Sequence, residues 1–546
     1  MRADQQYSLL DIYFAGFLAA RSGLAGQEKL TFENLVRDLS ASLAAGHSCL
    51  PVDRQEQGLL AGTGLVSAGG LSPLVLFHDR LYLHRYFTYE ARLAAQIMVL
   101  AQQTYPVPDG GALLDACFGP ETDEVDWQKK AAETAMHKAF CIISGGPGTG
   151  KTSTVVRIIG LLLQANGCDL QVALAAPTGK AAMRLRQSVG DSLESLPFPE
   201  PILTAIPSEA RTLHRLLGAR GNSPHFRHTG ENPLPWDVVV VDEASMVDLA
   251  MMSKLVDALK PGSRLLLLGD KDQLASVESG AVLIDLVRAL PENTVELRKT
   301  YRFNAAIKDL AQAVNRGEGE AAWRLLAGPP SKDVGLVDAP LEQFVGDRYG
   351  LYMEQVGRCG EVGYEQVFAA FNGFRVLCAV RRGERGVEGI NAGVEQYLAQ
   401  QGCDCLSRVW YPGRPVLITR NDYSLNLSNG DIGICLPDPR DGSLKVWFEQ
   451  PDGTFKTCLP YRLPHCETAY ALTIHKCQGS EFDEVLVVLP REENRILSRE
   501  LIYTAVTRAR KRVLLAASKD ILDQALAGKI ERFSGLQEML QKDRPG

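Results

Sequence analysis

The chain has 546 residues, of which 45% are hydrophobic and 23% charged, and its formal net charge is −7. This length is too great for one hydrophobic core, so it predicts three or four domains of ordinary globular composition. The acidic balance argues against a protein that coats its whole surface with nucleic acid, and any nucleic-acid path must be a local groove.

Neither the cysteines nor the N-terminus indicates an extracytoplasmic protein. The twelve cysteines are scattered without a CxxC pair or a His/Cys cluster at zinc spacing, which favours reduced, mostly buried thiols. The apolar stretch from Phe14 to Ala20 is too short to cross a bilayer, and Asp11 interrupts the run before it. We therefore expect a cytoplasmic protein with no membrane partner.

Residues 1–110 are predicted to form a helical N-terminal domain. Apolar positions recur at helical spacing from Leu9 to Leu43 and from Phe87 to Gln102. The turn-rich stretch YPVPDGG, from Tyr105 to Gly111, indicates its boundary. The aromatic residues between Tyr82 and Tyr89 are interpreted as core, with a base-stacking surface as the alternative.

Residues 121–300 alternate short β-branched runs with helical patterns. The runs are CIISG, VALAAP, VVVVDEAS and LLLLGD, and each of the first three precedes a helical segment. Such alternation predicts a parallel sheet with right-handed crossovers, typical of a nucleotide-binding α/β core.

A second α/β core is predicted from residues 301–410 and 464–546, with VLCAV, EVLVVL and Arg512 to Ala516 as strands. Residues 411–463 interrupt it with short strands split by turn signals at barrel-like intervals. The signals are Asn429-Gly430-Asp431, Pro437 to Gly442 and Pro451-Asp452-Gly453. We interpret this insertion as a small β-barrel.

A phosphate-binding loop is predicted at GGPGTGKT, because it follows a predicted strand and opens a predicted helix. Glycines allow backbone N–H groups to point at phosphates, Lys151 can reach the β and γ oxygens, and the Thr152 hydroxyl can ligate Mg²⁺. The residues expected around ATP are Gly145, Gly146, Pro147, Gly148, Thr149, Gly150, Lys151, Thr152 and Ser153.

The predicted catalytic groups follow later strands. Four valines deliver Asp242 and Glu243 at a strand end, where we expect Asp242 to bind the metal and Glu243 to accept a proton from water. The next strand leads into GDKDQLASVESG, which places Gln273 where its amide could sense the γ-phosphate. Arg302 and Arg508 are candidate cations for the charge that develops during phosphoryl transfer.

Taken in order, these elements resemble the helicase motifs of superfamily 1. Their residues are most similar to those of the RecD family, the alpha subunit of exodeoxyribonuclease V. The resemblance covers roughly Trp127 to Arg512. Its motifs are WQ, GGPGTGKT, APTGKAA, RTLHRLLG, VVDEASM, GDKDQLASVESG, TYRF, LTIHKCQGSEF and YTAVTRAR.

The resemblance implies two RecA-like cores with ATP between them, a small SH3-like barrel, and further nucleotide contacts. Gln128 would read the adenine edge, Tyr301 would stack on the base, and Gly479 and Glu481 would lie near the ribose. Arg302 and Arg508 would be arginine fingers.

Single-stranded DNA would run over both cores in such a helicase. Hydroxyls and short basic groups grip phosphates without reading sequence, although several of them could instead cap helices or turns. The candidate contacts are Thr178, Lys180, Thr212, His214, Asn421, Thr473, His475 and Lys476. An insert at about residues 218–235 is either a strand-separating pin or a plain surface loop.

The resemblance implies an ATP- and Mg²⁺-dependent 5′ to 3′ DNA helicase that unwinds duplex ends in double-strand break repair and recombination. It would be a subunit of a RecBCD complex, with RecB-like and RecC-like partners docked through the N-terminal domain. A stand-alone RecD-like helicase is the alternative, and a P-loop interaction switch is a more distant one. Because the sequence shows no acidic cluster typical of two-metal nucleases beyond the ATP site, we expect DNA degradation to belong to a partner.

Overall fold

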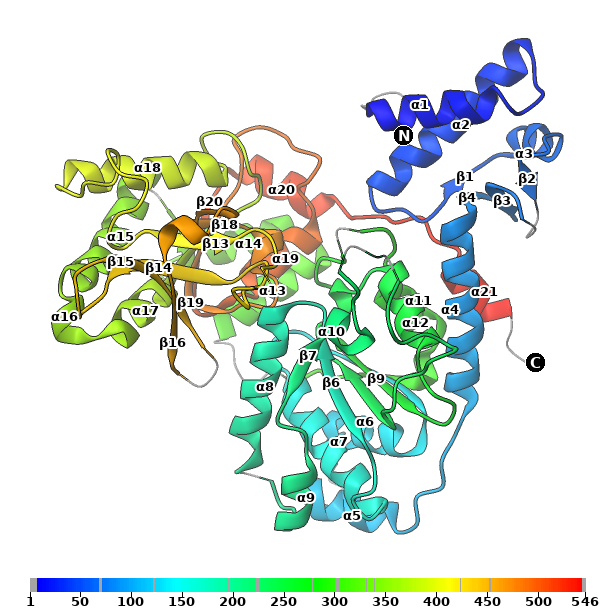
Figure 1. Ribbon diagram of the computed structural model, residues 1–546, viewed down its shortest axis with the longest axis horizontal. Coiled ribbons are helices and arrows are strands. Elements are labelled where there is room, and N and C mark those ends of the chain that lie inside the picture. Colours follow the sequence, from blue (N-terminus) through cyan, green and yellow to red (C-terminus); the bar gives the residue numbers. More distant parts are fainter. Residues whose placement is uncertain are drawn as a thin grey trace.

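The computed structural model describes residues 7–67, 71–120, 123–194, 196–221, 223, 225–276, 278–299, 305–329, 331–337, 339–422, 424–450 and 453–542. The chain forms an N-terminal region followed by two parallel-sheet cores, and an antiparallel insertion interrupts the second core (Figure 1). Within the described residues, no helix combines the length and apolar character that a membrane span requires. All twelve cysteines are free thiols.

The N-terminal region is only partly helical, so the prediction of a helical domain was incomplete. Its helices are α1 (Leu9–Ala19), α2 (Gly26–Ala44), α3 (Arg54–Ala61) and α4 (His84–Gln102). Between them lies a sheet in the order β1-β4-β3-β2, formed by Leu50–Pro51, Arg80–Leu83, Leu74–Phe77 and Val66–Ser67. The strands are two to four residues long, too short for a clear alternation. In the turn between β3 and β4, His78 adopts the left-handed φ of 52°. A glycine at this position would have indicated a hairpin turn in the sequence.

Helix α4 connects this region to the first core. Its buried residues Leu93, Ala94 and Ile97 belong to the same hydrophobic cluster as the strands of that core. Tyr82 is fully buried, and Phe87 packs against it, which confirms that these aromatics form core. The C-terminal helix α21 (Leu536–Lys542) packs on α4 and on α12 of the first core (Figure 1).

Core 1 is a six-stranded parallel sheet in the order β10-β5-β9-β8-β6-β7, which confirms the predicted α/β core. The strands are β5 (Phe140–Ser144), β6 (Val172–Ala176), β7 (Ala210–Thr212), β8 (Val238–Val241), β9 (Arg264–Gly269) and β10 (Thr294–Glu296). Its helices are α5 (Gly110–Phe118), α6 (Trp127–His137), α7 (Lys151–Ala165), α8 (Gly179–Leu193), α9 (Glu200–Ala205), α10 (Leu213–Leu217), α11 (Leu249–Asp257) and α12 (Val282–Ala289). Strands β5, β6 and β8 are buried throughout, as expected for a sheet covered by helices on both faces.

Core 2 is a five-stranded parallel sheet in the order β11-β20-β19-β12-β18, as predicted. The strands are β11 (Val334–Leu336), β12 (Phe374–Cys378), β18 (Ala471–Thr473), β19 (Phe482–Val488) and β20 (Ala509–Ala516). Its helices are α13 (Ala305–Arg316), α14 (Gly319–Ala327), α15 (Leu341–Gly357), α16 (Cys359–Val362), α17 (Tyr364–Gly373), α18 (Val387–Gln400), α19 (Arg499–Val506) and α20 (Lys519–Ala527).

The insertion is a five-stranded antiparallel sheet in the order β16-β15-β14-β13-β17. Its strands are β13 (Pro415–Ile418), β14 (Ile432–Pro437), β15 (Leu444–Glu449), β16 (Phe455–Cys458) and β17 (Cys466–Thr468). The predicted turns fall between these strands, with Gly430, Gly442 and Gly453 all at positive φ. The sheet is confirmed, whereas its closure into an SH3-like barrel stays a prediction.

Candidate active site

The loop from Gly145 to Gly150 joins buried strand β5 to helix α7. Gly148 and Gly150 have φ values of 75° and 83°, which glycine adopts without strain. Lys151 is the first residue of α7, and its Nζ donates to the carbonyls of Gly145 at 2.6 Å and Gly146 at 3.0 Å. An ammonium group folded over a helix N-terminus in this way provides the cation and the oriented N–H groups that bind phosphate.

A cavity of about 290 Å³ lies next to this loop, between the two cores. It contains most of the residues predicted for ATP binding and hydrolysis. They are Pro147, Gly148, Gly150, Lys151, Thr152, Ser153, Asp242, Glu243, Gln273, Gly479, Glu481 and Arg508.

Asp242 and Glu243 enter the cavity at the end of buried strand β8. Burial raises the pKa of Asp242 to about 6, and the neighbouring charge of Glu243 adds to this shift while Lys151 opposes it. Glu243 holds φ at 52°, a left-handed value that is uncommon for a side chain of this size and typical of functional turns. The Asp242 carboxylate and the Thr152 hydroxyl supply oxygen ligands of the kind that Mg²⁺ prefers.

Arg508 reaches from core 2 to core 1. It is 1% exposed, and its Nη2 donates to Gln273 Oε1 at 2.7 Å. Its Nε and Nη1 donate to the carbonyls of Thr504 and Ser480 at 3.2 and 3.4 Å, which fixes the guanidinium. An arginine held beside the phosphate loop in this way can stabilise charge that develops during phosphoryl transfer.

The loop that carries Gln273 is bound to core 2 at further points. The backbone N–H of Leu274 donates to Thr504 Oγ1 at 2.9 Å, and Gln478 Nε2 donates to the Leu274 carbonyl at 2.9 Å. The two cores are therefore linked at the catalytic loop itself.

Arg184 is a site residue that the sequence analysis missed. It lies in α8, lines the cavity, pairs with Glu481 at 2.7 Å and donates to the Gly479 carbonyl at 3.0 Å. Its position four residues after Lys180 places both side chains on one face of the helix, and that spacing could have found it. Glu481, predicted near the ribose, is in the cavity but engaged in this ion pair.

Other residues predicted to contact ATP, among those that the structure describes, lie in or next to the phosphate loop but do not line the cavity. Gln128 Nε2 lies 3.5 Å from the Thr149 carbonyl, and Thr149 Oγ1 donates to the Gly146 carbonyl at 2.8 Å. Tyr301 and Arg302 lie outside the described residues, so their roles in stacking and catalysis stay predictions.

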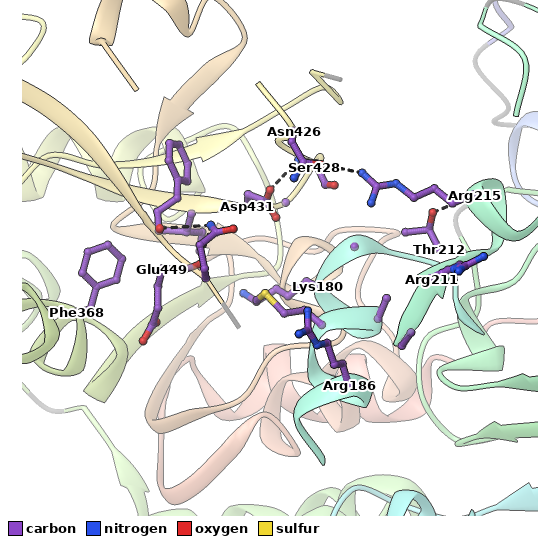
Figure 2. Close-up of a pocket in the computed structure, with 18 of the residues that line it drawn as sticks. Lys180, Arg186, Arg211, Thr212, Arg215, Phe368, Asn426, Ser428, Asp431 and Glu449 are labelled. Atoms are coloured by element: carbon purple, nitrogen blue, oxygen red, sulfur yellow. Dashed lines mark hydrogen bonds between the residues drawn. The ribbon is translucent and has the colours of Figure 1, made fainter. Parts of the chain in front are cut away.

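Two adjoining cavities separate core 1 from the insertion. One, of about 570 Å³, is lined by the predicted DNA contacts Thr178, Thr212, His214 and Asn421. The other, of about 350 Å³, is lined by Lys180 together with Arg186, Arg211 and Arg215, three arginines that we had not predicted (Figure 2). Both share Gly179, Thr212, Arg215 and Ser428, so they form one groove with a cationic wall.

The helix-cap alternative also applies to the predicted DNA contacts. Thr178, Thr212 and Thr473 each accept a backbone N–H at the start of a helical turn. Among the described residues that line the two cavities, Thr473, His475 and Lys476 are not found, and Lys476 pairs with Glu467. Asn421 Oδ1 accepts the N–H of Asn429 at 2.8 Å.

Comparison with known proteins decides the family. Residues 128–279 match an AAA domain, and residues 468–516 match a UvrD-like helicase C-terminal domain. The RecBCD enzyme subunit RecD of Mycolicibacterium smegmatis is 42% identical over 86% of this chain and 83% of its own length. The chain belongs to the RecD family of superfamily 1 helicases.

Other relatives agree with this assignment. The RecBCD enzyme subunit RecD of Haemophilus influenzae is 32% identical, over 94% of this chain and 88% of its own length. The ATP-dependent RecD2 DNA helicase of Deinococcus radiodurans is 32% identical over 98% of the chain and 73% of its own length. The chain is an ATP-dependent helicase.

Among solved structures, a crystal structure of Bacteroides Pif1 bound to ssDNA covers 73% of this chain and 94% of its own length, at 16% identity and a TM-score of 0.41. This similarity is too low to add to the assignment.

Proposed function

We propose that this chain is the 5′ to 3′ DNA helicase subunit of a RecBCD-type complex and unwinds duplex ends during double-strand break repair and recombination. The observation that carries the subunit proposal is the 42% identity to a RecBCD enzyme subunit RecD. The hydrogen bond between Gln273 of core 1 and Arg508 of core 2, beside the phosphate loop, supports the motor role, because hydrolysis would then depend on contact between the two cores. We expect the proposed complex to act in the cytoplasm, together with its DNA substrate.

Each step of hydrolysis has a group in the cavity. Lys151 and the loop N–H groups bind the phosphates, and Glu243 accepts the proton of the attacking water. Asp242 and Thr152 would hold Mg²⁺, which when bound neutralises phosphate charge. Arg508 stabilises the transferring phosphoryl group, so the complete site exists only while the cores are together.

ATP hydrolysis would drive movement of the two cores, because ATP binding favours a closed cleft between them and product release favours an open one. DNA would lie in the groove between core 1 and the insertion. Four cationic side chains line it, and one of them, Arg215, donates to Asn426 of the insertion (Figure 2). We infer that the antiparallel insertion is a small SH3-like barrel that forms the opposite wall.

The test uses the intact complex and the full-length chain. Single-stranded DNA should raise ATP hydrolysis many-fold, and a duplex with a 5′ tail should be unwound while its 3′-tailed counterpart is not. Affinity purification of the chain from its native cell should retain two larger subunits. If DNA does not stimulate hydrolysis in the complex, the helicase proposal fails; if only the 3′-tailed duplex is unwound, the polarity is wrong.

The second candidate is a helicase that acts alone, supported by the likeness to the RecD2 DNA helicase. The subunit proposal is favoured because the identity to RecBCD subunits reaches 42% against 32% for RecD2. Recovery of a monomeric, fully active chain from the native cell would favour the second candidate.

A further inference from the structure

Asp270, the residue that follows strand β9, joins three parts of the ATP site. Its carboxylate is 2% exposed, and Oδ1 accepts the backbone N–H of Asp272 at 3.0 Å. Its Oδ2 accepts Gln273 Nε2 at 3.0 Å and the hydroxyl of Tyr503, from α19 of core 2, at 3.1 Å. One carboxylate oxygen therefore holds a side chain from each core.

These contacts close a ring of hydrogen bonds across the cleft. Tyr503 and Gln273 both donate to Asp270, Arg508 donates to Gln273, and Arg508 also donates to the carbonyl of Thr504, the residue next to Tyr503. An ionised carboxylate only accepts and a guanidinium only donates, so the Gln273 amide has one orientation that satisfies both neighbours. The ring consequently fixes which way Gln273 faces.

The Tyr503 hydroxyl also lies against the phosphate loop. A β-carbon at Gly146 would be 3.0 Å from Tyr503 Oη and 3.9 Å from Asp270 Oδ2. Any residue other than glycine at position 146 would push this hydroxyl away. Tyr503 is thus placed by the loop on one side and by Asp270 on the other.

The charges around the ring suit these roles. Burial raises the pKa of Asp270 to about 6; the positive charge of Lys151 opposes that shift and the charge of Asp272 adds to it. The Asp270 oxygens accept from two N–H groups and one hydroxyl, the acceptor role of an ionised carboxylate. Burial and the Asp270 charge raise the pKa of Tyr503 well above its ordinary value, so the phenol keeps its proton and donates.

We propose that Tyr503 is a positioning residue for ATP hydrolysis: through Asp270 it holds Gln273 against Arg508, so that the arginine is aligned only when core 2 is seated on the phosphate loop. Tyr503 does not touch the reacting atoms. Its loss should leave nucleotide binding nearly intact and reduce the rate of the chemical step. This inference rests on the proposed role of Arg508 in catalysis.

The test compares Tyr503→Phe with Tyr411→Phe in the full-length chain. Tyr411, the first residue of the insertion, is a buried tyrosine that packs in the hydrophobic cluster of core 2, 1% exposed against 8% for Tyr503. Its hydroxyl donates to the Glu395 carboxylate at 2.7 Å, and it lines neither the ATP cavity nor the groove. A hydrogen bond to a charged group commonly contributes about tenfold to an equilibrium, so Tyr503→Phe should lower kcat about tenfold with KM for ATP within about twofold. Tyr411→Phe should leave both constants near those of the wild type.

A second measurement separates positioning from general destabilisation. In an Arg508→Ala background the ring is already broken, so adding Tyr503→Phe should reduce kcat by less than about twofold. Full additivity of the two losses would overturn the proposal, as would a wild-type kcat in Tyr503→Phe or an equal loss in Tyr411→Phe. If wild-type hydrolysis were insensitive to DNA, the helicase proposal would fail instead, and the same comparisons would still decide the role of Tyr503 on the DNA-independent rate.

Discussion

Core 1 and core 2 have the same architecture at their carboxyl edges but different loops. In core 1, β5 leads through Gly145–Gly150 into α7, and the loop leaves room for phosphates beside Lys151. In core 2, β12 leads through residues 379–386 into α18, and here the loop closes on itself. A β-carbon at Gly386 would lie 2.4 Å from the carbonyl oxygen of Arg382, and one at Gly389 would lie 2.5 Å from that of Glu384.

The difference shows that the sheet fixes where a loop lies, whereas the residues of the loop determine whether it can bind phosphate. Core 2 contributes to the ATP site from another element, the end of α19, where Arg508 points back at core 1. An ATPase whose phosphate loop lies in one core and whose arginine, Arg508, comes from the other must bring its cores together in order to react.

The largest effect is expected from removing the core 1 cation. Lys151→Gln removes the charge that binds the β and γ phosphates, so ATP hydrolysis should fall by at least about a thousandfold, while assembly with partner subunits stays intact. Steady-state phosphate release and co-purification measure the two outcomes.

The matched control lies in core 2. Arg385, the basic residue nearest the start of α18, donates to the carbonyls of Leu489 and Ala516, both at 3.5 Å. Arg385→Gln should keep hydrolysis within about twofold of the wild type, because no phosphate is expected there. Equal losses in both variants would mean that the two loops are not functionally different; wild-type hydrolysis by Lys151→Gln would refute the assignment of the phosphate loop.

The next effect concerns the arginine that core 2 donates. Arg508→Ala should still bind ATP but hydrolyse it about a thousandfold more slowly, because an arginine finger acts mainly in the transition state. Fluorescent-nucleotide titration gives the affinity and single-turnover quench gives the rate. A defect confined to DNA binding would contradict this role.

The grouping of the candidate ATP-site residues in one cavity was largely predictable from sequence, because they occupy short segments at strand ends. A glycine-rich turn after β5 and an acidic pair after β8 place Lys151, Asp242 and Glu243 at one sheet edge without further information. Helical spacing from Lys180 could have pointed to Arg184, but its pairing with Glu481 depends on which atoms of the other core lie opposite. The same holds for the contact of Tyr503 with Asp270. Pairing across a cleft is a tertiary fact that local spacing does not encode.

Elsewhere the short elements limited the prediction. The N-terminal sheet has strands of two to four residues and a turn without glycine, so periodicity favoured helix there. The arginines of the groove were missed for another reason. Arg211 and Arg215 lie in the motif RTLHRLLG and Arg186 lies in another helix, and they come together with Lys180 only where α8, β7 and α10 meet the insertion. Surface arginines are common, so these gave no distinct signal in the sequence.

The smallest expected effect is a change in DNA affinity when Lys180 of core 1 loses its proton. It tests whether core 2 influences a proposed DNA contact of core 1. Burial, followed by the nearby charge of Arg375 from core 2, lowers the pKa of Lys180 to about 8. Arg184 adds to that shift, while Asp431 and Cys477 oppose it. The ammonium is therefore charged below this pH and loses its proton above it, and a lost phosphate contact weakens single-strand binding only about fivefold.

The affinity for oligo(dA), whose bases do not titrate in this range, should accordingly fall a few-fold between pH 7 and pH 9, as fluorescence anisotropy can measure. Lys180→Arg keeps the charge throughout and should remove this pH dependence. Lys180→Ala should bind more weakly than the wild type at pH 7, with a salt slope smaller by about 0.7, and close to the wild type at pH 9. Bound phosphate stabilises the ammonium, so the titration in the complex should lie above that of the unliganded chain. A pH dependence that survives in Lys180→Arg would assign the titration to another group and would remove the argument that core 2, through Arg375, tunes a DNA contact of core 1.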